Sequence, residues 1–165
     1  VSGFESVLTM NTGAEAVETA IKAARRWGYF SKGIPEDKAE IIVANGNFHG
    51  RTTTIVSFST DASYKDGFGP FTPGFNSAEY CGSCDCKSID SCLSIESFEK
   101  KINKNTCAIL VEPIQGEAGI RVPTDGWLKQ LRDLCTSRNI LLILDEIQSG
   151  LGRTGKLFAL SLIHI

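Results

Sequence analysis

Apolar residues occur along this chain in two patterns, as short unbroken runs and as repeats at helical spacing. The runs at positions 41–44 and 108–111 predict buried strands, and the run of four aliphatic residues at 141–144 predicts a strand buried on both faces. Between the last two runs lies a set of apolar residues at helical spacing: Trp127, Leu128, Leu131, Leu134 and Cys135. This order predicts a β-α-β unit with parallel strands and a right-handed crossover.

The ends of two helices are also indicated. A first helix is predicted from about residue 14 to residue 27, and Gly28 follows it, where a glycine commonly ends a helix. For the later helix, Thr124 is the expected N-cap and Arg138 lies in the expected last turn.

Polar residues follow each of the three predicted strands, at positions 45–51, 112–117 and 145–148. The carboxyl ends of parallel strands share one edge of a sheet, so we expect these residues to converge on one crevice. The sequence therefore predicts an α/β domain, mainly parallel, with its chemistry at that edge.

The composition indicates which kinds of binding partner suit this chain. The chain has 165 residues, of which 42% are hydrophobic, enough for a core of single-domain size. The net charge of −2 offers no basic field for nucleic acid or for an anionic membrane surface, which favours a small-molecule partner. No signal-like or transit-like segment is visible. We expect the chain to be truncated at both ends, with residues 160–165 a non-native tail.

A first interpretation of Asp145 is a nucleotide-hydrolysing site. Four aliphatic residues followed by Asp145 imitate the magnesium-binding strand of P-loop ATPases, and residues 150–156 spell G-x-x-x-x-G-K. This interpretation is disfavoured because Leu157 replaces the Ser or Thr that ligates magnesium. In addition, no buried strand immediately precedes Gly150, and the two elements come in the wrong order.

A second interpretation is an organic cofactor. Gly13 and Ala14 open the first helix, where backbone amides can bind one phosphate. Phe48 or His49 offers a flat surface for an aromatic ring. Asp145 can keep a pyridine nitrogen protonated, so that the ring withdraws electrons. Together these groups describe a site for pyridoxal 5′-phosphate.

Four ordered segments then carry a resemblance. Residues 11–16 (NTGAEA), 48–52 (FHGRT), 111–117 (VEPIQGE) and 144–148 (LDEIQ), the last followed by 150–155 (GLGRTG), resemble the class III aminotransferases of fold type I. The resemblance covers almost all of the chain from residue 7 to residue 159. It implies that residues 1–159 are part of a pyridoxal-phosphate-binding large domain, a three-layer α/β/α structure that is incomplete here. A cysteine-rich insertion at about 76–94 departs from the family pattern.

Within the class, residues 66–70, 73–74 and Ala118 are most similar to the branch that moves the δ-amino group of ornithine to 2-oxoglutarate. Enzymes acting on acetylornithine or on other ω-amino substrates remain the alternative. The resemblance also implies a homodimer, whereas the compartment stays open between mitochondrial matrix and cytoplasm.

The resemblance assigns roles to eight residues. Gly13 and Ala14 match the phosphate-binding positions, Phe48 the residue that stacks on the ring, and Asp145 the partner of the pyridine nitrogen. Gln148 matches a position near the phenolic oxygen of the cofactor, and Glu112 a carboxylate behind the pocket.

Two further positions match substrate-binding residues. Arg51 corresponds to the residue that binds the substrate α-carboxylate, for which a guanidinium gives two parallel hydrogen bonds. Glu117 corresponds to a carboxylate that pairs with an arginine outside this chain. The family's Schiff-base lysine is also outside, because Lys156 is the only lysine beyond Asp145 and lies too close to it. We therefore expect no catalytic residue in this chain and no transaminase activity from it alone.

The six cysteines fall into two groups. Cys107 and Cys135 lie in the predicted strand and helix, where a thiol behaves as a small hydrophobic group. The second group has C-x2-C-x-C-x5-C spacing: Cys81, Cys84, Cys86 and Cys92. These residues are either ordinary reduced thiols or, less expectedly, a zinc site or redox-sensitive pair. A competing function is therefore a non-catalytic fragment or paralogue whose insertion binds a metal or a partner.

Overall fold

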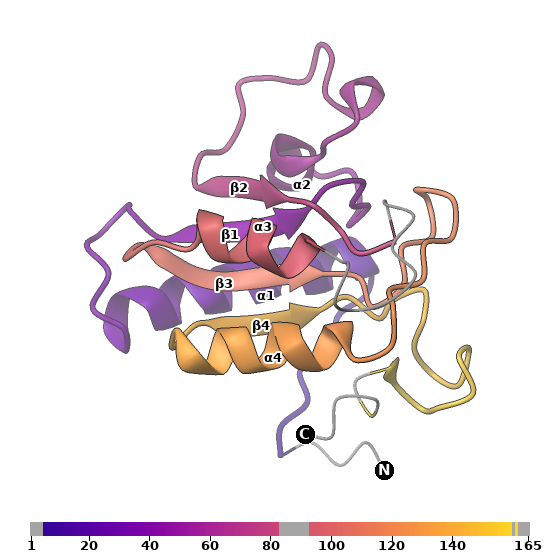
Figure 1. Cartoon of the computed structure of the whole chain (residues 1–165). Helices are drawn as coiled ribbons and strands as arrows, with labels where there is room; N and C mark the ends of the chain where they lie inside the picture. The colour runs from indigo at the N-terminus through magenta and orange to yellow at the C-terminus, as the bar shows by residue number, and fades with distance from the viewer. Residues whose placement is uncertain (1–4, 83–92, 160, 162–165) are drawn as a thin grey trace.

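The computed structural model describes residues 5–82, 93–159 and 161 (Figure 1). The strands are β1 (Glu40–Ala44), β2 (Phe75–Ala78), β3 (Thr106–Val111) and β4 (Leu141–Leu144). The helices are α1 (Gly13–Phe30), α2 (Thr53–Phe58), α3 (Ser94–Lys101) and α4 (Trp127–Ser137), with a short 3-10 helix η1 (Ala62–Tyr64). All three predicted strands and both predicted helices are present.

The strands form one parallel sheet in the order β2-β1-β3-β4. In β3 and β4, Ala108 pairs with Leu141 and Val111 with Leu144, on either side of α4 in the sequence. The predicted β-α-β unit with parallel strands is thus confirmed. Residues 76–78, at the start of the expected cysteine-rich insertion, lie in β2 and pair with β1.

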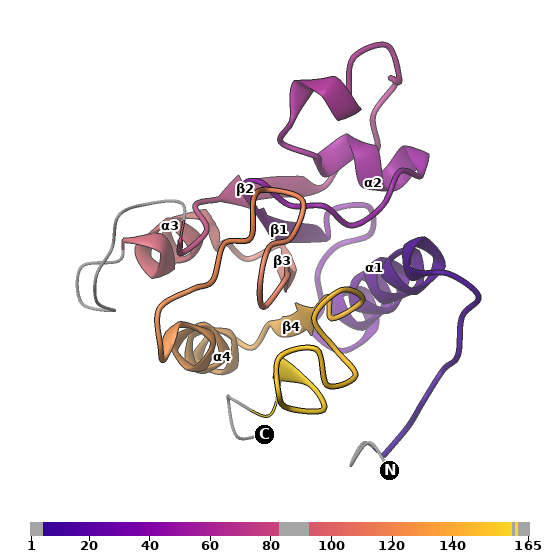
Figure 2. The ribbon, with the colours of Figure 1, turned by 90° about the vertical axis from the view of Figure 1, so that its right-hand side faces the viewer.

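Helices cover both faces of the sheet, with α1 and α2 on one side and α3 and α4 on the other (Figure 2). Alternate residues of β1 and β4 face the two cores. Ile41 and Val43 pack with Val17 and Ile21 of α1, whereas Ile42 packs in the cluster that contains Trp127 of α4. This arrangement is the expected three-layer α/β/α domain.

Helix α1 does not end at Gly28, where the sequence predicted its end. The Thr12 side chain caps its start by accepting a hydrogen bond from the Glu15 amide at 3.2 Å. The helix then continues through Gly28, which is buried, to Phe30. A Cβ at Gly28 would lie 2.9 Å from the Cβ of Cys107 in β3, so the glycine allows close packing of helix on sheet and does not end the helix.

Thr124, the predicted N-cap of helix α4, is not its N-cap residue. The N-cap residue is Gly126, whose φ of 85° turns the chain into the helix without a side-chain cap. Thr124 lies before that turn, where its backbone amide donates to the Cys81 sulfur at 3.4 Å. Arg138, expected in the last turn, is the C-cap residue, one position beyond the helix end at Ser137.

Strand β4 is not fully buried on both faces, as the sequence predicted it to be. Its residues pack into both cores, Leu142 and Leu144 on one face and Leu141 and Ile143 on the other. All four are only partly buried, because β4 is an outer strand of the described sheet. Among the described residues, no helix combines the length and apolar character needed to cross a bilayer.

Candidate cofactor site

A cavity of about 270 Å³ lies at the carboxyl edge of the sheet, the edge that faces the viewer in Figure 2. Its lining comes from the start of α1 and from the segments that follow β1, β3 and β4: Gly13, Ala14, Phe48, His49, Gly50, Glu112, Ile114, Glu117, Asp145, Ile147 and Gln148. The predicted convergence of three polar strand ends on one crevice is thus confirmed, and seven of the eight expected site residues line it.

Asp145 is held by two donors. Its Oδ2 lies 2.6 Å from Nδ1 of His49, and its Oδ1 accepts from the backbone amide of Ile147 at 3.1 Å. The His49 side chain is fully buried and that of Asp145 is only 5% exposed. An ionised carboxylate can only accept hydrogen bonds, so Nδ1 of His49 carries the proton that they share. The carboxylate therefore has a fixed direction in a poorly solvated place.

His49 does not offer an open ring face. As an alternative to Phe48, it was expected to offer a flat surface for stacking, but its ring is enclosed beside the Phe58 ring, 5.9 Å between centroids. Its Nε2 atom is buried and has no hydrogen-bond partner among the described residues. His49 instead supports Asp145, whereas Phe48 lines the cavity.

Glu112 is a buried residue of the cavity lining and fixes the position of Phe48. Its Oε1 accepts from the Phe48 amide at 2.9 Å, and its Oε2 from the Gly116 amide at 3.5 Å. Burial raises the pKa of the Glu112 carboxyl above its usual value, and these amides and nearby His49 oppose part of that rise. One buried carboxylate therefore joins the segments after β1 and β3.

Small residues bring the start of α1 close to two loops. A Cβ at Gly13 would lie 2.8 Å from Cδ1 of Ile147, and a Cβ at Gly50 would lie 3.1 Å from Cβ of Ala14. Gly50 also has a φ of 124°, which side chains rarely adopt. The first amides of a helix have no intrahelical acceptor, so those of Gly13 and Ala14 remain available beside the cavity.

Gln148 and Glu117 lie at the open side of the cavity, and both residues are exposed. The Gln148 side chain crosses the backbone of Gly116, where a Cβ would fall 1.6 Å from Oε1 of Gln148. Gly116 is therefore required for this side-chain position. The sequence motif contains Gly116 but does not show which side chain occupies the space above it.

Arg51 is the expected site residue that does not line the cavity. It is exposed, and its guanidinium carbon lies 5.8 Å from the centroid of the Phe48 ring. Arg51 thus lies at the rim, in contact with a residue of the wall.

Of the four cysteines in the expected metal or redox group, Cys84, Cys86 and Cys92 lie outside the described residues. Cys81 is buried, and its sulfur lies 3.3 Å from the Thr124 hydroxyl. Cys107 and Cys135 are buried in β3 and α4, as predicted for small hydrophobic groups. Burial raises the pKa of the Cys107 thiol to about 11 and that of Cys135 to about 12.

A parallel α/β domain with such a crevice is typical of pyridoxal-phosphate enzymes of fold type I. The chain belongs to the class III aminotransferases, because the family model for aminotransferase class-III matches residues 1–165. Enzymes of this class are pyridoxal-phosphate-dependent.

Individual relatives show which members of the class this chain is similar to. The ornithine aminotransferase of Brevibacillus brevis is 55% identical over 159 residues, which are 96% of this chain and 37% of that protein. The crystal structure of the ornithine aminotransferase of Toxoplasma gondii matches with a TM-score of 0.86 and 47% identity, over 99% of this chain and 36% of that one. Acetylornithine aminotransferase of Elizabethkingia anophelis matches with a TM-score of 0.73 and 51% identity, over 99% of this chain and 37% of that one.

These matches confirm the fold type I architecture, and the chain is similar over almost its whole length to curated proteins named ornithine aminotransferase. The chain spans about 37% of the length of the curated relative from Brevibacillus. A second structure of the Toxoplasma enzyme, crystallised with oxidised glutathione, has partial occupancy of pyridoxal phosphate at its active site.

Proposed function

We propose that this chain forms the cofactor-binding part of an ornithine aminotransferase. Such an enzyme moves the δ-amino group of L-ornithine to 2-oxoglutarate and yields L-glutamate 5-semialdehyde and L-glutamate. The observation that carries the proposal is the buried Asp145 carboxylate, held at 2.6 Å by His49 in a cavity that the start of α1 also lines.

The residues around this cavity fit pyridoxal phosphate at both ends. A phosphate group needs amide donors with no side chain in the way, and Gly13 and Ala14 at the start of an 18-residue helix meet that need. A pyridine nitrogen needs a carboxylate of fixed direction, which Asp145 offers. When bound, the cofactor supplies an electron sink for the bond that breaks at the reacting carbon.

Three residues of the chain orient the cofactor ring. Asp145 accepts a hydrogen bond from the ring nitrogen and keeps the proton on it. Phe48 presents its ring face to the cofactor, at a position set by the hydrogen bond from its amide to Glu112 at 2.9 Å. Gln148, above Gly116, donates to the phenolic oxygen.

Arg51 and Glu117 are proposed to bind the substrates. A guanidinium at the rim of the crevice binds a carboxylate through two parallel hydrogen bonds. Glu117 lies at the opening and selects between the two substrates by its negative charge, together with an arginine from elsewhere in the whole enzyme. This supports an amino acid and a 2-oxo acid as the substrate pair.

We also propose that the whole enzyme is a homodimer. Apolar side chains are strongly exposed on the loops that follow the strands, with Ile120 at 75% and Leu151 at 79% exposure. Large contiguous apolar surfaces mark contact sites, and we assign these side chains to the surface that the partner subunit covers.

Acetylornithine is the second candidate substrate, favoured by the 51% identity to the Elizabethkingia enzyme. The two are separated by assaying the full-length enzyme with either amino donor and 2-oxoglutarate. A kcat/KM for ornithine at least about tenfold higher than for N-acetylornithine supports the proposal, and the reverse order overturns it.

The role of the cofactor site is tested by Asp145→Asn in the full-length enzyme. We expect kcat to fall by about a hundredfold or more, because a neutral amide does not hold the ring-nitrogen proton. The control is Asp133→Asn, which removes an exposed carboxylate on α4 that bonds only Lys129, at 2.8 Å, among the described residues. Wild-type turnover in Asp145→Asn would contradict the proposed site.

A further inference from the structure

Tyr64 forms a cluster with Phe48, which lines the cavity, and with Arg51 at its rim. It belongs to η1 (Ala62–Tyr64). This short helix lies in the segment between α2 and β2, residues 59–74, called here the 59–74 connection. Its ring centroid lies 5.6 Å from that of Phe48, with the planes at 62°. The guanidinium carbon of Arg51 lies 5.1 Å from the Tyr64 centroid and 5.8 Å from the Phe48 centroid. One cation therefore contacts two aromatic rings.

This kind of contact holds a guanidinium without using its donors. A cation within about 6 Å of a ring centroid is attracted by the electrons of the ring face, whereas a carboxylate partner would occupy two N–H groups. No ion pair in the described part of the chain includes Arg51. The five N–H donors of Arg51 are thus left for a carboxylate that comes from outside.

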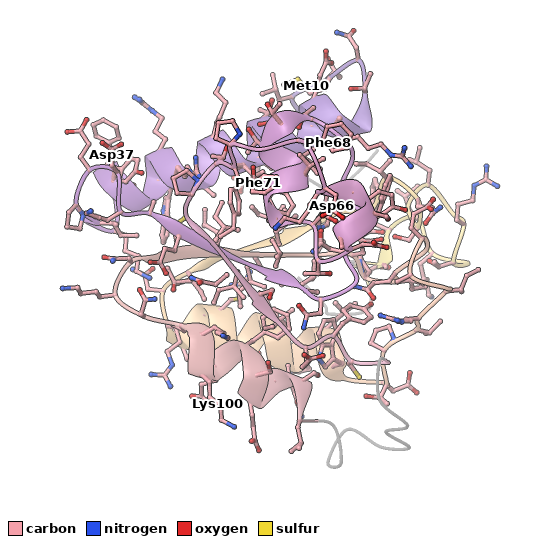
Figure 3. All side chains as sticks on the ribbon, turned by 90° about the horizontal axis from the view of Figure 1, so that it is seen from above. Met10, Asp37, Asp66, Phe68, Phe71 and Lys100 are labelled. Carbon is pink, nitrogen blue, oxygen red and sulfur yellow. The ribbon has the colours of Figure 1, made fainter. Side chains whose placement is uncertain are left out.

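Hydrogen bonds within the 59–74 connection, and one from it to α2, hold the segment that carries the Tyr64 ring. The Asp61 carboxylate caps η1 by accepting from the amide and hydroxyl of Ser63 at 2.8 and 2.7 Å. The ammonium of Lys65 donates to the Ser57 carbonyl in α2 at 3.1 Å. Figure 3 views the molecule from the side of this connection, whose Asp66, Phe68 and Phe71 are labelled.

We propose that Tyr64 is a positioning residue that sets the orientation of Arg51 for the carboxylate of the substrate. The inference rests on the proposed function of Arg51 and extends it to a residue that never needs to touch the substrate. It also assigns the 59–74 connection a part in substrate affinity.

The test is a set of variants of the full-length enzyme, assayed for KM and kcat with ornithine and 2-oxoglutarate. Tyr64→Phe keeps the ring, and we expect a KM within about twofold of wild type. Tyr64→Leu removes the ring, and we expect KM for a carboxylate substrate to rise about three- to tenfold with kcat within about twofold. The matched control is Phe68→Leu, on the same connection and 60% exposed, which should leave both constants unchanged.

Arg51→Met separates the two proposals. If Arg51→Met raises KM and Tyr64→Leu does not, the inference about Tyr64 is wrong and the proposed function stands. If Arg51→Met leaves KM unchanged, the proposed role of Arg51 itself is wrong. In the Arg51→Met background, the effect of Tyr64→Leu on KM should disappear, because the two residues act through one contact.

A variant that folds poorly is recognised by its cofactor absorbance and thermal midpoint. The comparison of Tyr64→Leu with Tyr64→Phe in the two Arg51 backgrounds then decides the matter. An equal KM effect of Tyr64→Leu in both backgrounds would overturn the inference.

Discussion

The Nδ1 atom of His49 lies 2.6 Å from Oδ2 of Asp145, although 96 positions separate the two residues in the sequence. The contact joins the turn after β1 to the end of β4 across the intervening strand β3. It fixes the direction of the carboxylate on which the proposed site depends.

His49→Leu removes this hydrogen bond and leaves Asp145 with the Ile147 amide as its remaining described donor. A hydrogen bond to a charged group contributes about 1.5–3 kcal/mol, so we expect cofactor affinity to fall about ten- to hundredfold. His49→Asn is the matched variant, because its side-chain amide places a donor near the position of Nδ1 and should retain most of the affinity. Equilibrium titration of the cofactor-free full-length enzyme measures both, and equal affinities for the two variants would contradict the prediction.

Glu112 is expected to make stability depend on pH. Its pKa is raised in the folded chain, mainly by burial, so the folded chain binds that proton more tightly than the unfolded chain does. This contribution is fully present below the ordinary pKa of glutamate and is lost as pH rises through the raised value of the folded state. We expect the free energy of unfolding of the cofactor-free enzyme to fall over that interval, and Glu112→Gln to remove that part of the slope. Urea unfolding at closely spaced pH values would refute this by giving identical slopes.

Gly116→Ala is expected to displace Gln148, because the added Cβ would lie 1.6 Å from its Oε1. That atom is the far end of an exposed side chain that can move aside, so we expect little loss of stability. We expect cofactor affinity to fall about two- to tenfold, because Gln148 loses the position from which it donates. In a Gln148→Ala background the same substitution meets no such atom and should cost much less. Equilibrium titration of the four cofactor-free full-length proteins in this cycle is the measurement, and additive effects on cofactor affinity would contradict the steric explanation.

Gly28→Ala gives a prediction in which the sign alone is informative. In an exposed helix interior this change stabilises by about 1 kcal/mol, because alanine has the higher helix propensity. Here the new Cβ would lie 2.9 Å from Cβ of Cys107, so we expect destabilisation instead. A raised thermal midpoint in the variant would show that helix α1 and the sheet move apart at little cost.

The sequence was sufficient for the elements whose burial is periodic. Strand β3 and helix α4 follow from unbroken and helically spaced apolar residues, and the four motifs located seven of the cavity residues. Strand β2 was not predicted, because its residues FNSA form no aliphatic run and it lies at an outer position of the described sheet. Short amphipathic helices such as α3 give a similarly weak signal.

The misses have a common physical cause, which is a partner distant in sequence. Gly28 reads locally as a helix end, but its neighbour in space is Cys107. His49 reads as a second aromatic surface, and only the fold brings it to Asp145. Tyr64 lies in a connection without a recognisable pattern, and its contact with Arg51 depends on how that connection folds back.

The lining of the crevice runs from Gly13 to Gln148, and this has a consequence for how the protein matures. A growing chain completes the crevice only after Gln148 has left the ribosome and β4 has joined the sheet. A ligand that binds only the finished crevice adds its binding free energy to the folded state and ties the first helix to the last strand. Binding of the cofactor would then stabilise the contacts between α1 and the segment after β4. Loss of the cofactor would remove that stabilisation from the carboxyl edge of the sheet.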